Sequence, residues 1–228
     1  MDARYDNGQT PLHVASQLEQ HRVIESLIDR DADPSAVNAF KETPLSLASG
    51  NGNTEVASVL LSRGAHVNHV DSENRTALHE ASEMGQNAIA RLLFEYGANP
   101  NKKDAYGWTA LHLASRTVVE TLLRHGAEVN VVNKSLWTPL QFASQEGHVE
   151  VVESLLVTGG RVDERNGDGE AALHLAAYYG HVGVKVLIGH QADWHVQNEK
   201  QKTALDLARD KSSRNVVQLL EEARIAGD

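Results

Sequence analysis

A seven-residue motif recurs along the chain at a nearly constant interval, and this repetition restricts the fold more than any other feature. It occurs as TPLHVAS at Thr10, TPLSLAS at Thr43, TALHEAS at Thr76, TALHLAS at Thr109, TPLQFAS at Thr138, AALHLAA at Ala171 and TALDLAR at Thr203. Successive copies start 33, 33, 33, 29, 33 and 32 residues apart. Periods of about 20–50 residues are typical of chains built from small stacked units. We therefore expect a linear array of seven units.

Each unit reads as two short helices joined by a tight turn. A leucine two residues and an alanine five residues after every motif start lie on one helical face. Threonine suits a helix start, and proline suits the first helical position in the three TPL copies. Glycines mark the turn at Gly52, Gly85, Gly147 and Gly180, and the end of the second helix at Gly64, Gly97, Gly126 and Gly159. Asp31 and Gln191 replace this second glycine, where a left-handed backbone costs up to about 1 kcal/mol.

These residues give the chain a resemblance to the ankyrin repeat family, whose pattern is DxxGxTPLHxA, GHxxVVxxLL and GAxVN. The best local matches are DAYGWTALHLA at residues 104–114 and EGHVEVVESLL at residues 146–156. The resemblance covers the whole chain. It implies an all-α solenoid of helix-turn-helix units with projecting loop or hairpin fingers. We expect one domain over residues 1–228, with units starting near 5, 38, 71, 104, 133, 166 and 198 and the last unit acting as a C-terminal cap.

Charge and composition exclude several functional classes. The formal net charge is −10, which argues against nucleic acid as the main partner. The absence of cysteine excludes disulfides, thiol catalysis and cysteine-bound zinc, and it fits a reducing compartment. No apolar run is long enough to cross a bilayer, and the N-terminus lacks a signal-peptide core. We expect a cytoplasmic or nuclear protein that does not insert into membranes.

The twelve histidines do not indicate a metal site. Four of them, His13, His79, His112 and His174, occupy one position of the motif, and the family resemblance implies that this histidine makes structural hydrogen bonds within and between repeats. The chain has no HExxH, phosphate-binding loop or GxSxG motif. We expect no catalytic residue, no metal and no cofactor, and therefore no enzyme.

Large side chains at positions that the repeat does not dictate are better candidates for function. The family resemblance implies that partners contact the fingers and the end of each first helix. Exposed aromatic residues are common anchors of protein interfaces. The predicted partner-binding residues are Phe40, Arg75, Met84, Tyr106, Trp108, Trp137, Tyr178 and Tyr179. The alternative is that these aromatic residues pack on neighbouring fingers, as Trp137 could on Trp108, and packing is the favoured role for Trp194.

Two functional hypotheses remain at this point. The first is a non-catalytic protein-binding module, expected to be a monomer, whose acidic surroundings favour a basic or mixed apolar–basic partner. The second is a structural spacer or intramolecular scaffold within a larger multidomain protein. Fold alone does not decide between them, because repeat proteins of one architecture serve many roles.

The fourth unit departs from the others. Its segment LHLASRTVVETLLRHGA, residues 111–127, lacks four residues when it is aligned with QFASQEGHVEVVESLLVTGG, residues 141–160. We predict an abrupt turn near Ser115 to Thr117 and one helix that is shorter by a turn. The missing residues are assigned to the turn between the helices and to the first residue of the second helix. Neutral drift, or residues missing from this sequence, is favoured over function as the origin of the deletion.

Overall fold

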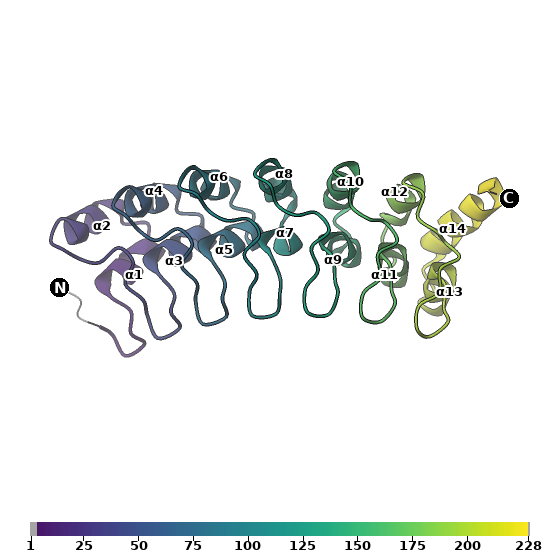
Figure 1. Ribbon diagram of the computed structural model, residues 1–228, viewed down its shortest axis with the longest axis horizontal. Helices are drawn as coiled ribbons and strands as arrows, with labels where there is room; N and C mark the ends of the chain where they lie inside the picture. The colour runs from purple at the N-terminus through teal and green to yellow at the C-terminus, as the bar shows by residue number, and fades with distance from the viewer. Residues whose placement is uncertain (1–3, 228) are drawn as a thin grey trace. The chain divides into compact units, whose positions relative to one another are not determined.

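A computed structural model describes residues 4–227 of the chain, and this part contains fourteen α-helices and no β-strand (Figure 1). Contacts between residues divide the chain into two compact units, one ending at Ala127 and the other beginning at Glu128. We number the repeats 1 to 7 in chain order and call the loop before each first helix its finger. The all-helical class expected from the sequence is confirmed. The expectation of a single domain over residues 1–228 stays a prediction.

The N-terminal unit holds repeats 1 to 4. Its helices are α1 (Pro11–Gln17), α2 (His21–Ile28), α3 (Pro44–Asn51), α4 (Thr54–Ser62), α5 (Ala77–Glu83), α6 (Asn87–Glu95), α7 (Ala110–Leu113) and α8 (Arg116–Arg124). The first helices of the repeats, α1, α3, α5 and α7, pack in sequence, and so do the second helices, α2, α4, α6 and α8. The unit is therefore a two-layer stack of helix pairs.

The C-terminal unit holds repeats 5 to 7 and has the same two layers. Its helices are α9 (Pro139–Glu146), α10 (Val149–Val157), α11 (Ala172–Tyr179), α12 (Val184–Gly189), α13 (Ala204–Asp210) and α14 (Arg214–Gly227). Helix α11 packs between α9 and α13, and α12 packs between α10 and α14.

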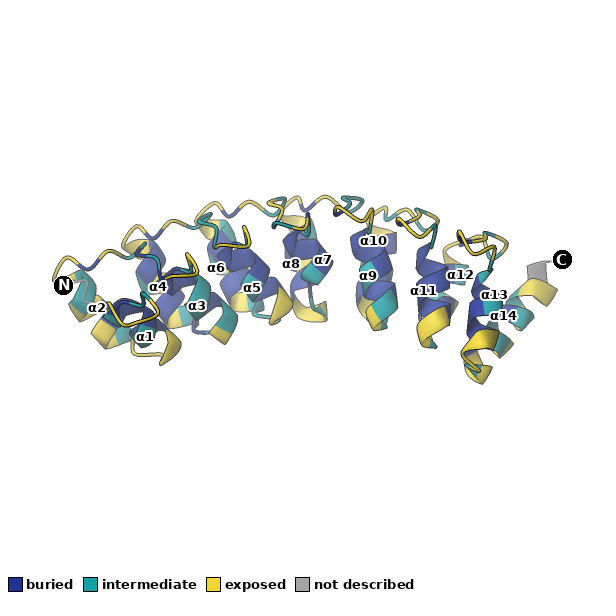
Figure 2. Cartoon of the chain, turned by 90° about the horizontal axis from the view of Figure 1, so that it is seen from below, coloured by how far each residue is buried: buried dark blue, intermediate teal, exposed yellow. Residues whose placement is uncertain are grey.

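The motif residues form the core as the spacing predicts. The leucine two residues after each start is buried in repeats 1 to 6 and half-buried in repeat 7, and the alanine five residues after is buried in all seven. The helices carry most of the buried residues, whereas the loops are mainly exposed or intermediate (Figure 2). Complete burial of one leucine side chain stabilises the folded state by about 1.5–3 kcal/mol relative to exposure.

Helix starts and ends also follow the sequence. Extended threonines precede six of the first helices, and the Thr43 hydroxyl accepts a hydrogen bond from the Ser46 amide at 3.1 Å. All eight marked glycines have positive φ, from 73° to 96°. Asp31 and Gln191 have φ of 64° and 65°, so the predicted left-handed backbone is confirmed at both.

Within each unit, every finger after the first forms a backbone hydrogen bond with the preceding finger. The Ser72 amide donates to the Phe40 carbonyl at 2.9 Å, and the Ala105 amide donates to the Glu73 carbonyl at 2.7 Å. In the C-terminal unit, the Glu199 amide donates to the Asp168 carbonyl at 3.2 Å. These bonds set the spacing of the finger side chains along each unit.

The predicted break in repeat 4 is confirmed, but the assignment of one lost residue to the start of the second helix is wrong. Helix α7 has four residues, whereas α8 keeps nine and starts at Arg116, which aligns with Val149 at the start of α10. The deletion therefore removes the last turn of the first helix and the connecting turn. The chain turns at Ala114 and Ser115, which have extended ψ angles of 122° and 163°.

Candidate functional site

The repeated histidines are structural, as the resemblance implies. The Nδ1 atom of His13 lies 3.1 Å from the Thr10 amide, and its Nε2 atom lies 3.0 Å from the Glu42 carbonyl oxygen in the next repeat. His79 and His174 contact the carbonyl oxygens of Trp108 and Val196 in the same way, at 3.3 and 3.0 Å. Burial lowers the pKa of His13, His79 and His174 below the ordinary value of 6.5, so these rings stay neutral at pH 7.

In the N-terminal unit, three predicted residues lie around two adjoining hollows of about 310 and 210 Å³. Phe40 and Arg75 line the larger hollow, and Met84 lines the smaller. We call these hollows the N-terminal groove. Its walls are strongly acidic, with the carboxylates Glu42, Asp71, Glu73, Glu80 and Glu83.

Arg75 is held inside this groove by its own chain. Its Nε atom donates to Glu80 at 2.8 Å, a second nitrogen pairs with Glu83, and its side chain is 17% exposed. Burial disfavours the charge of Arg75, but the two glutamates outweigh this effect and raise its pKa. Burial also raises the pKa of Glu80, although attraction to Arg75 partly offsets that rise. The groove therefore keeps a net negative charge after Arg75 has paired with Glu80 and Glu83.

Tyr106 and Trp108 line neither of these hollows. Tyr106 is exposed at the tip of its finger. The Trp108 ring is half-buried and lies edge-on against the His112 ring, with 5.3 Å between centroids. The Trp108 side chain thus packs on the structural histidine of its own repeat.

In the C-terminal unit, the other three predicted residues lie together. Trp137, Tyr178 and Tyr179 line one hollow of about 520 Å³, which we call the C-terminal groove. Trp137 comes from the finger of repeat 5, and the two tyrosines end α11. The Tyr178 and Tyr179 rings are perpendicular, with 5.0 Å between centroids.

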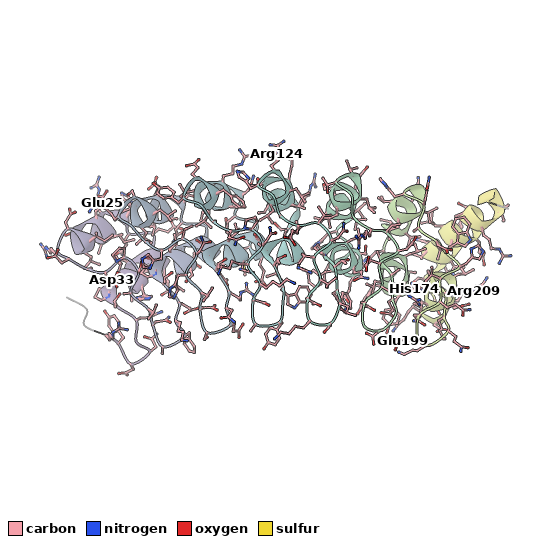
Figure 3. All side chains as sticks on the ribbon, viewed as in Figure 1. Glu25, Asp33, Arg124, His174, Glu199 and Arg209 are labelled. Atoms are coloured by element: carbon pink, nitrogen blue, oxygen red, sulfur yellow. The ribbon has the colours of Figure 1, made fainter. Side chains whose placement is uncertain are left out.

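The charged residues of this groove come from the fingers of repeats 6 and 7. Its carboxylates are Asp168, Glu170 and Glu199, and its one lysine is Lys200. Glu199 lies at the finger edge of the unit (Figure 3). Sequence reasoning missed these three carboxylates, although reading the finger positions of repeats 6 and 7 as in repeats 2 to 5 would have found them.

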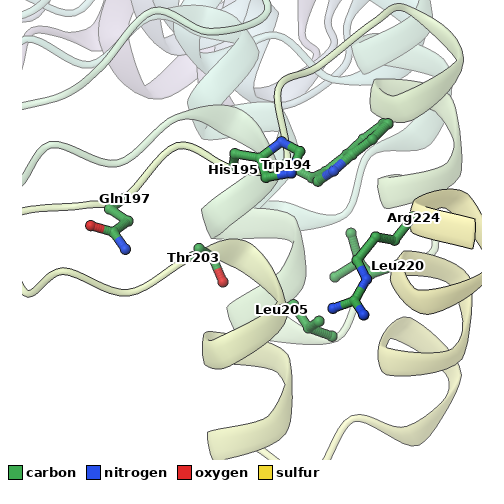
Figure 4. A pocket seen from close by; sticks show the side chains of 7 residues that line it. All are labelled: Trp194, His195, Gln197, Thr203, Leu205, Leu220 and Arg224. Atoms are coloured by element: carbon green, nitrogen blue, oxygen red, sulfur yellow. The ribbon is translucent and has the colours of Figure 1, made fainter. Parts of the chain in front are cut away.

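Trp194 is half-buried beside a third hollow, of about 410 Å³, as shown in Figure 4. Its indole nitrogen is buried and has no hydrogen-bond partner among the described residues. Leu205, Leu220 and Arg224 line the other side of this hollow. Because this nitrogen is buried, it is not exposed to a molecule in the hollow.

Two classes of site are absent from residues 4–227. No group of three or more histidine, aspartate or glutamate side chains is arranged to hold a metal ion there. None of the helices in that range has both the length and the apolar character needed to cross a membrane.

Comparison with known proteins agrees with the repeated architecture. The family model for ankyrin repeats matches in three copies, at residues 12–104, 96–165 and 140–226. The crystal structure of the human ASB11 ankyrin repeat domain is similar, with a TM-score of 0.86, 30% identity, and coverage of 94% of this chain and 98% of that one. The ankyrin repeat domain of Bcl-3 is also similar, with a TM-score of 0.76, 29% identity, and coverage of 95% and 100%.

Sequence relatives are much longer than this chain. It is 33% identical over 108 residues to alpha-latrotoxin-Lg1a of Latrodectus geometricus, which is 46% of this chain and 8% of the toxin. It is 36% identical over 108 residues to the Caenorhabditis elegans homolog of transient receptor potential cation channel subfamily A member 1, which is 45% of this chain and 9% of the channel. The match to the Arabidopsis thaliana putative E3 ubiquitin-protein ligase XBAT34 is 37% over 107 residues, 45% of this chain and 28% of that protein.

Proposed function

Because the chain belongs to the ankyrin repeat family, whose repeats are in general protein-interaction modules, we propose that it is a non-catalytic protein-binding module. The observation that carries this proposal is the C-terminal groove, where Trp137, Tyr178 and Tyr179 line one hollow. Aromatic side chains grouped in this way are typical anchors of a protein partner. The N-terminal groove, with Phe40, Arg75 and Met84, is the second proposed contact surface.

The proposed partner is a protein segment that is basic or mixed apolar and basic. Both grooves combine apolar side chains with an excess of carboxylates, and the chain carries a net charge of −10. Opposite charge on the partner accelerates encounter and disfavours acidic competitors. The same charge argues against nucleic acid as a partner. We propose a monomer that acts in the cytoplasm or nucleus without membrane insertion.

The titratable groups support a binding role over catalysis. The histidines with lowered pKa are the repeated structural ones, and the raised pKa of Glu80 belongs to a carboxylate paired with Arg75. The three histidines and Glu80 are thus engaged in hydrogen bonds or ion pairs within the chain. The grooves are open surfaces, whereas an enzyme needs converging groups in a site that excludes water.

The second candidate function is a spacer or intramolecular scaffold. The short share of the latrotoxin and channel relatives that this chain spans, 8% and 9%, favours it. In that case the grooves would contact other parts of a larger protein, or nothing.

A peptide-display selection tests the proposed binding function. Random twelve-residue peptides would be selected on the chain and then counter-screened on the Tyr179→Ala variant. Tyr179 is 51% exposed, so its loss should leave the fold intact, as circular dichroism would verify. We expect enriched peptides that bind the native chain at least tenfold more tightly than the variant, because an anchor contributes about 2 kcal/mol or more.

The matched control is Tyr96→Ala, which removes an exposed tyrosine at the end of α6. Selected peptides should bind this variant as they bind the native chain. Peptides that bind all three proteins equally, or no enrichment at all, would contradict the proposed groove and favour the spacer.

A further inference from the structure

The C-terminal groove combines aromatic faces with a negative charge balance. Its three carboxylates, Asp168, Glu170 and Glu199, exceed its single lysine, Lys200, by two charges. Its volume of about 520 Å³ lies within the range of about 300–1,000 Å³ that is usual for ligand pockets. The groove is therefore large enough for a long side chain, and its charge favours a cation.

Two of these carboxylates are unpaired. Among residues 4–227, the carboxylate oxygens of Asp168 and Glu199 make no hydrogen bond or ion pair, and only the backbone atoms of these residues are bonded. Glu170 differs, because its carboxylate accepts a weak hydrogen bond from the Asn198 side-chain Nδ2 atom at 3.3 Å. Asp168 and Glu199 thus keep their hydrogen-bonding capacity for a molecule from outside.

The aromatic surface beside them already attracts a cation within the chain. The Nζ atom of Lys211 lies 4.3 Å from the centroid of the Tyr178 ring, which is the geometry of a cation–π contact. Lys211 does not line the groove, so its amino group leaves the hollow open. The Tyr179 and Trp137 rings complete the aromatic lining.

We propose that the C-terminal groove holds the side chain of an arginine of the partner protein, a proposal that rests on the binding function proposed above. A guanidinium group is flat and weakly hydrated, so it stacks on aromatic rings. Its fork of N–H donors also matches carboxylate oxygens. The groove offers both kinds of contact, through Trp137 and Tyr179 on one hand and Asp168 and Glu199 on the other.

An NMR titration of the native chain tests this assignment. The three tryptophans give three indole N–H signals, and the Trp137→Phe variant identifies one of them. The probe is N-acetyl-arginine amide, and the matched probe is N-acetyl-citrulline amide, which has nearly the same shape but no charge. We expect the arginine compound to shift the Trp137 signal in a saturable manner and the citrulline compound to leave it nearly unchanged. The Trp108 and Trp194 signals serve as internal references.

Charge-neutralising variants test whether the groove carboxylates bind the arginine compound. The double variant Asp168→Asn/Glu199→Gln should bind the arginine compound about tenfold more weakly, because two charge attractions are lost. The control is Glu95→Gln/Glu153→Gln, which removes the same charge from exposed positions on α6 and α10. This control should bind within about twofold of the native chain, since distant exposed charges are screened.

Three results would overturn the arginine assignment. They are equal shifts with citrulline, equal weakening in the two double variants, and binding of Nα-acetyl-lysine amide as strong as that of the arginine compound. Failure here is distinguishable from failure of the proposed function. Selected peptides that depend on Tyr179 but lack arginine would keep the binding function and overturn this proposal. An arginine-dependent Trp137 shift without any selected Tyr179-dependent peptide would support an arginine site in the groove and contradict the proposed peptide-binding function.

Discussion

The residue three positions after the motif start joins two repeats at His13, His79, Gln141 and His174. At the same position in repeats 2 and 7, Ser46 and Asp206 bond within their own repeat. The position holds a histidine in repeats 1, 3, 4 and 6, but Gln141 takes it in repeat 5. The Gln141 Oε1 atom accepts from the Thr138 amide at 2.8 Å, and its Nε2 atom donates to the Glu164 carbonyl at 2.7 Å. Where the position joins two repeats, it therefore needs an acceptor for its own repeat and a donor for the next, rather than an imidazole.

This requirement predicts how the chain responds to acid. His174 is buried with a lowered pKa, so below about pH 6.5 the unfolded chain binds a proton that the folded chain does not. Its contribution to stability is therefore complete above pH 6.5 and is lost as the pH falls. His174→Gln should keep the stability at pH 7.5 and reduce the pH slope between 6.5 and 5 by up to about 1.4 kcal/mol per pH unit. Urea unfolding at each pH measures both.

The matched variant is His174→Ala. It also removes the titrating ring, but it leaves the Ala171 amide without its acceptor and the Val196 carbonyl without its donor. We expect a loss of about 1–3 kcal/mol at pH 7.5. An unchanged pH slope in both variants would show that His174 does not contribute to acid sensitivity.

The structural role of the repeated histidines was implied by the family resemblance, whereas the equivalence of Gln141 was not predicted. A sequence pattern compares residue types, and glutamine and histidine differ as types. In the folded chain they place an acceptor and a donor at similar reach, which only the geometry of the neighbouring repeat reveals.

Among the helix ends, Gln191 tests the cost of a left-handed residue. It has φ of 65° after α12, where repeats 2 to 5 use glycine. Gln191→Gly should raise the free energy of unfolding by about 1 kcal/mol, because glycine adopts positive φ without strain. The reverse change, Gly159→Gln after α10, should lower it by a similar amount. No atom lies within 4 Å of the position a Cβ would take at Gly159, so this comparison isolates the backbone. Denaturant unfolding of the two variants would show opposite shifts, and shifts of the same sign would refute this cause.

Repeat 4 keeps hydrogen bonds to repeat 3 although helix α7 lacks its last turn. In repeat 2, the Asn53 side chain donates to the Ser16 carbonyl of repeat 1 at 2.8 Å. In repeat 4, the backbone amide of Ser115 donates to the equivalent carbonyl of Ser82 at 3.1 Å. Thr117 adds a hydrogen bond to the Gly85 carbonyl at 2.9 Å. In repeat 4 a backbone amide therefore donates the hydrogen bond that an asparagine side chain donates in repeat 2. This replacement explains why the stack tolerates the deletion.

Inserting Gln-Glu-Gly-Asn between Ser115 and Arg116 tests this interpretation. The insertion should lengthen α7 by about one turn, and its asparagine should take the place that Asn53 has in repeat 2. We expect the free energy of unfolding to rise by about 1 kcal/mol, since added backbone hydrogen bonds contribute about 0.5–1.5 kcal/mol each. The control insertion Gln-Glu-Gly-Ala lacks the donor to the Ser82 carbonyl and should be about 1 kcal/mol less stable than the first. Equal stability of the two insertions would contradict the role of that donor.

Alignment of the repeats was sufficient to locate this break to within two residues, but not to assign the lost residues. The aligned anchors of α8 allow the gap to fall on either side of the turn. The choice depends on hydrogen bonds to repeat 3, which the sequence of repeat 4 does not contain.

For the whole molecule, the repeat pattern predicted which aromatic residues lie in fingers and at helix ends, but not which of them meet. Trp108 and Trp137 occupy equivalent motif positions, yet Trp108 packs on His112, whereas Trp137 lines a groove with the tyrosines of α11. Ring orientation depends on neighbouring side chains that vary between repeats. The carboxylates that set the charge of each groove also come from several repeats, so no single motif displays them.

The net charge of −10 gives a prediction for the molecule as a whole. An arginine-containing peptide selected on the chain should associate on the order of tenfold more slowly in 0.5 M than in 0.05 M sodium chloride, because salt screens the long-range attraction that steers encounter. The dissociation rate should change less, since contacts inside the groove are closer than the screening length. Stopped-flow tryptophan fluorescence measures both rates. The Glu95→Gln/Glu153→Gln variant should associate slightly more slowly with an unchanged dissociation rate, because it reduces the overall field without altering the groove. An association rate that is independent of salt would show that the acidic surface does not steer this partner.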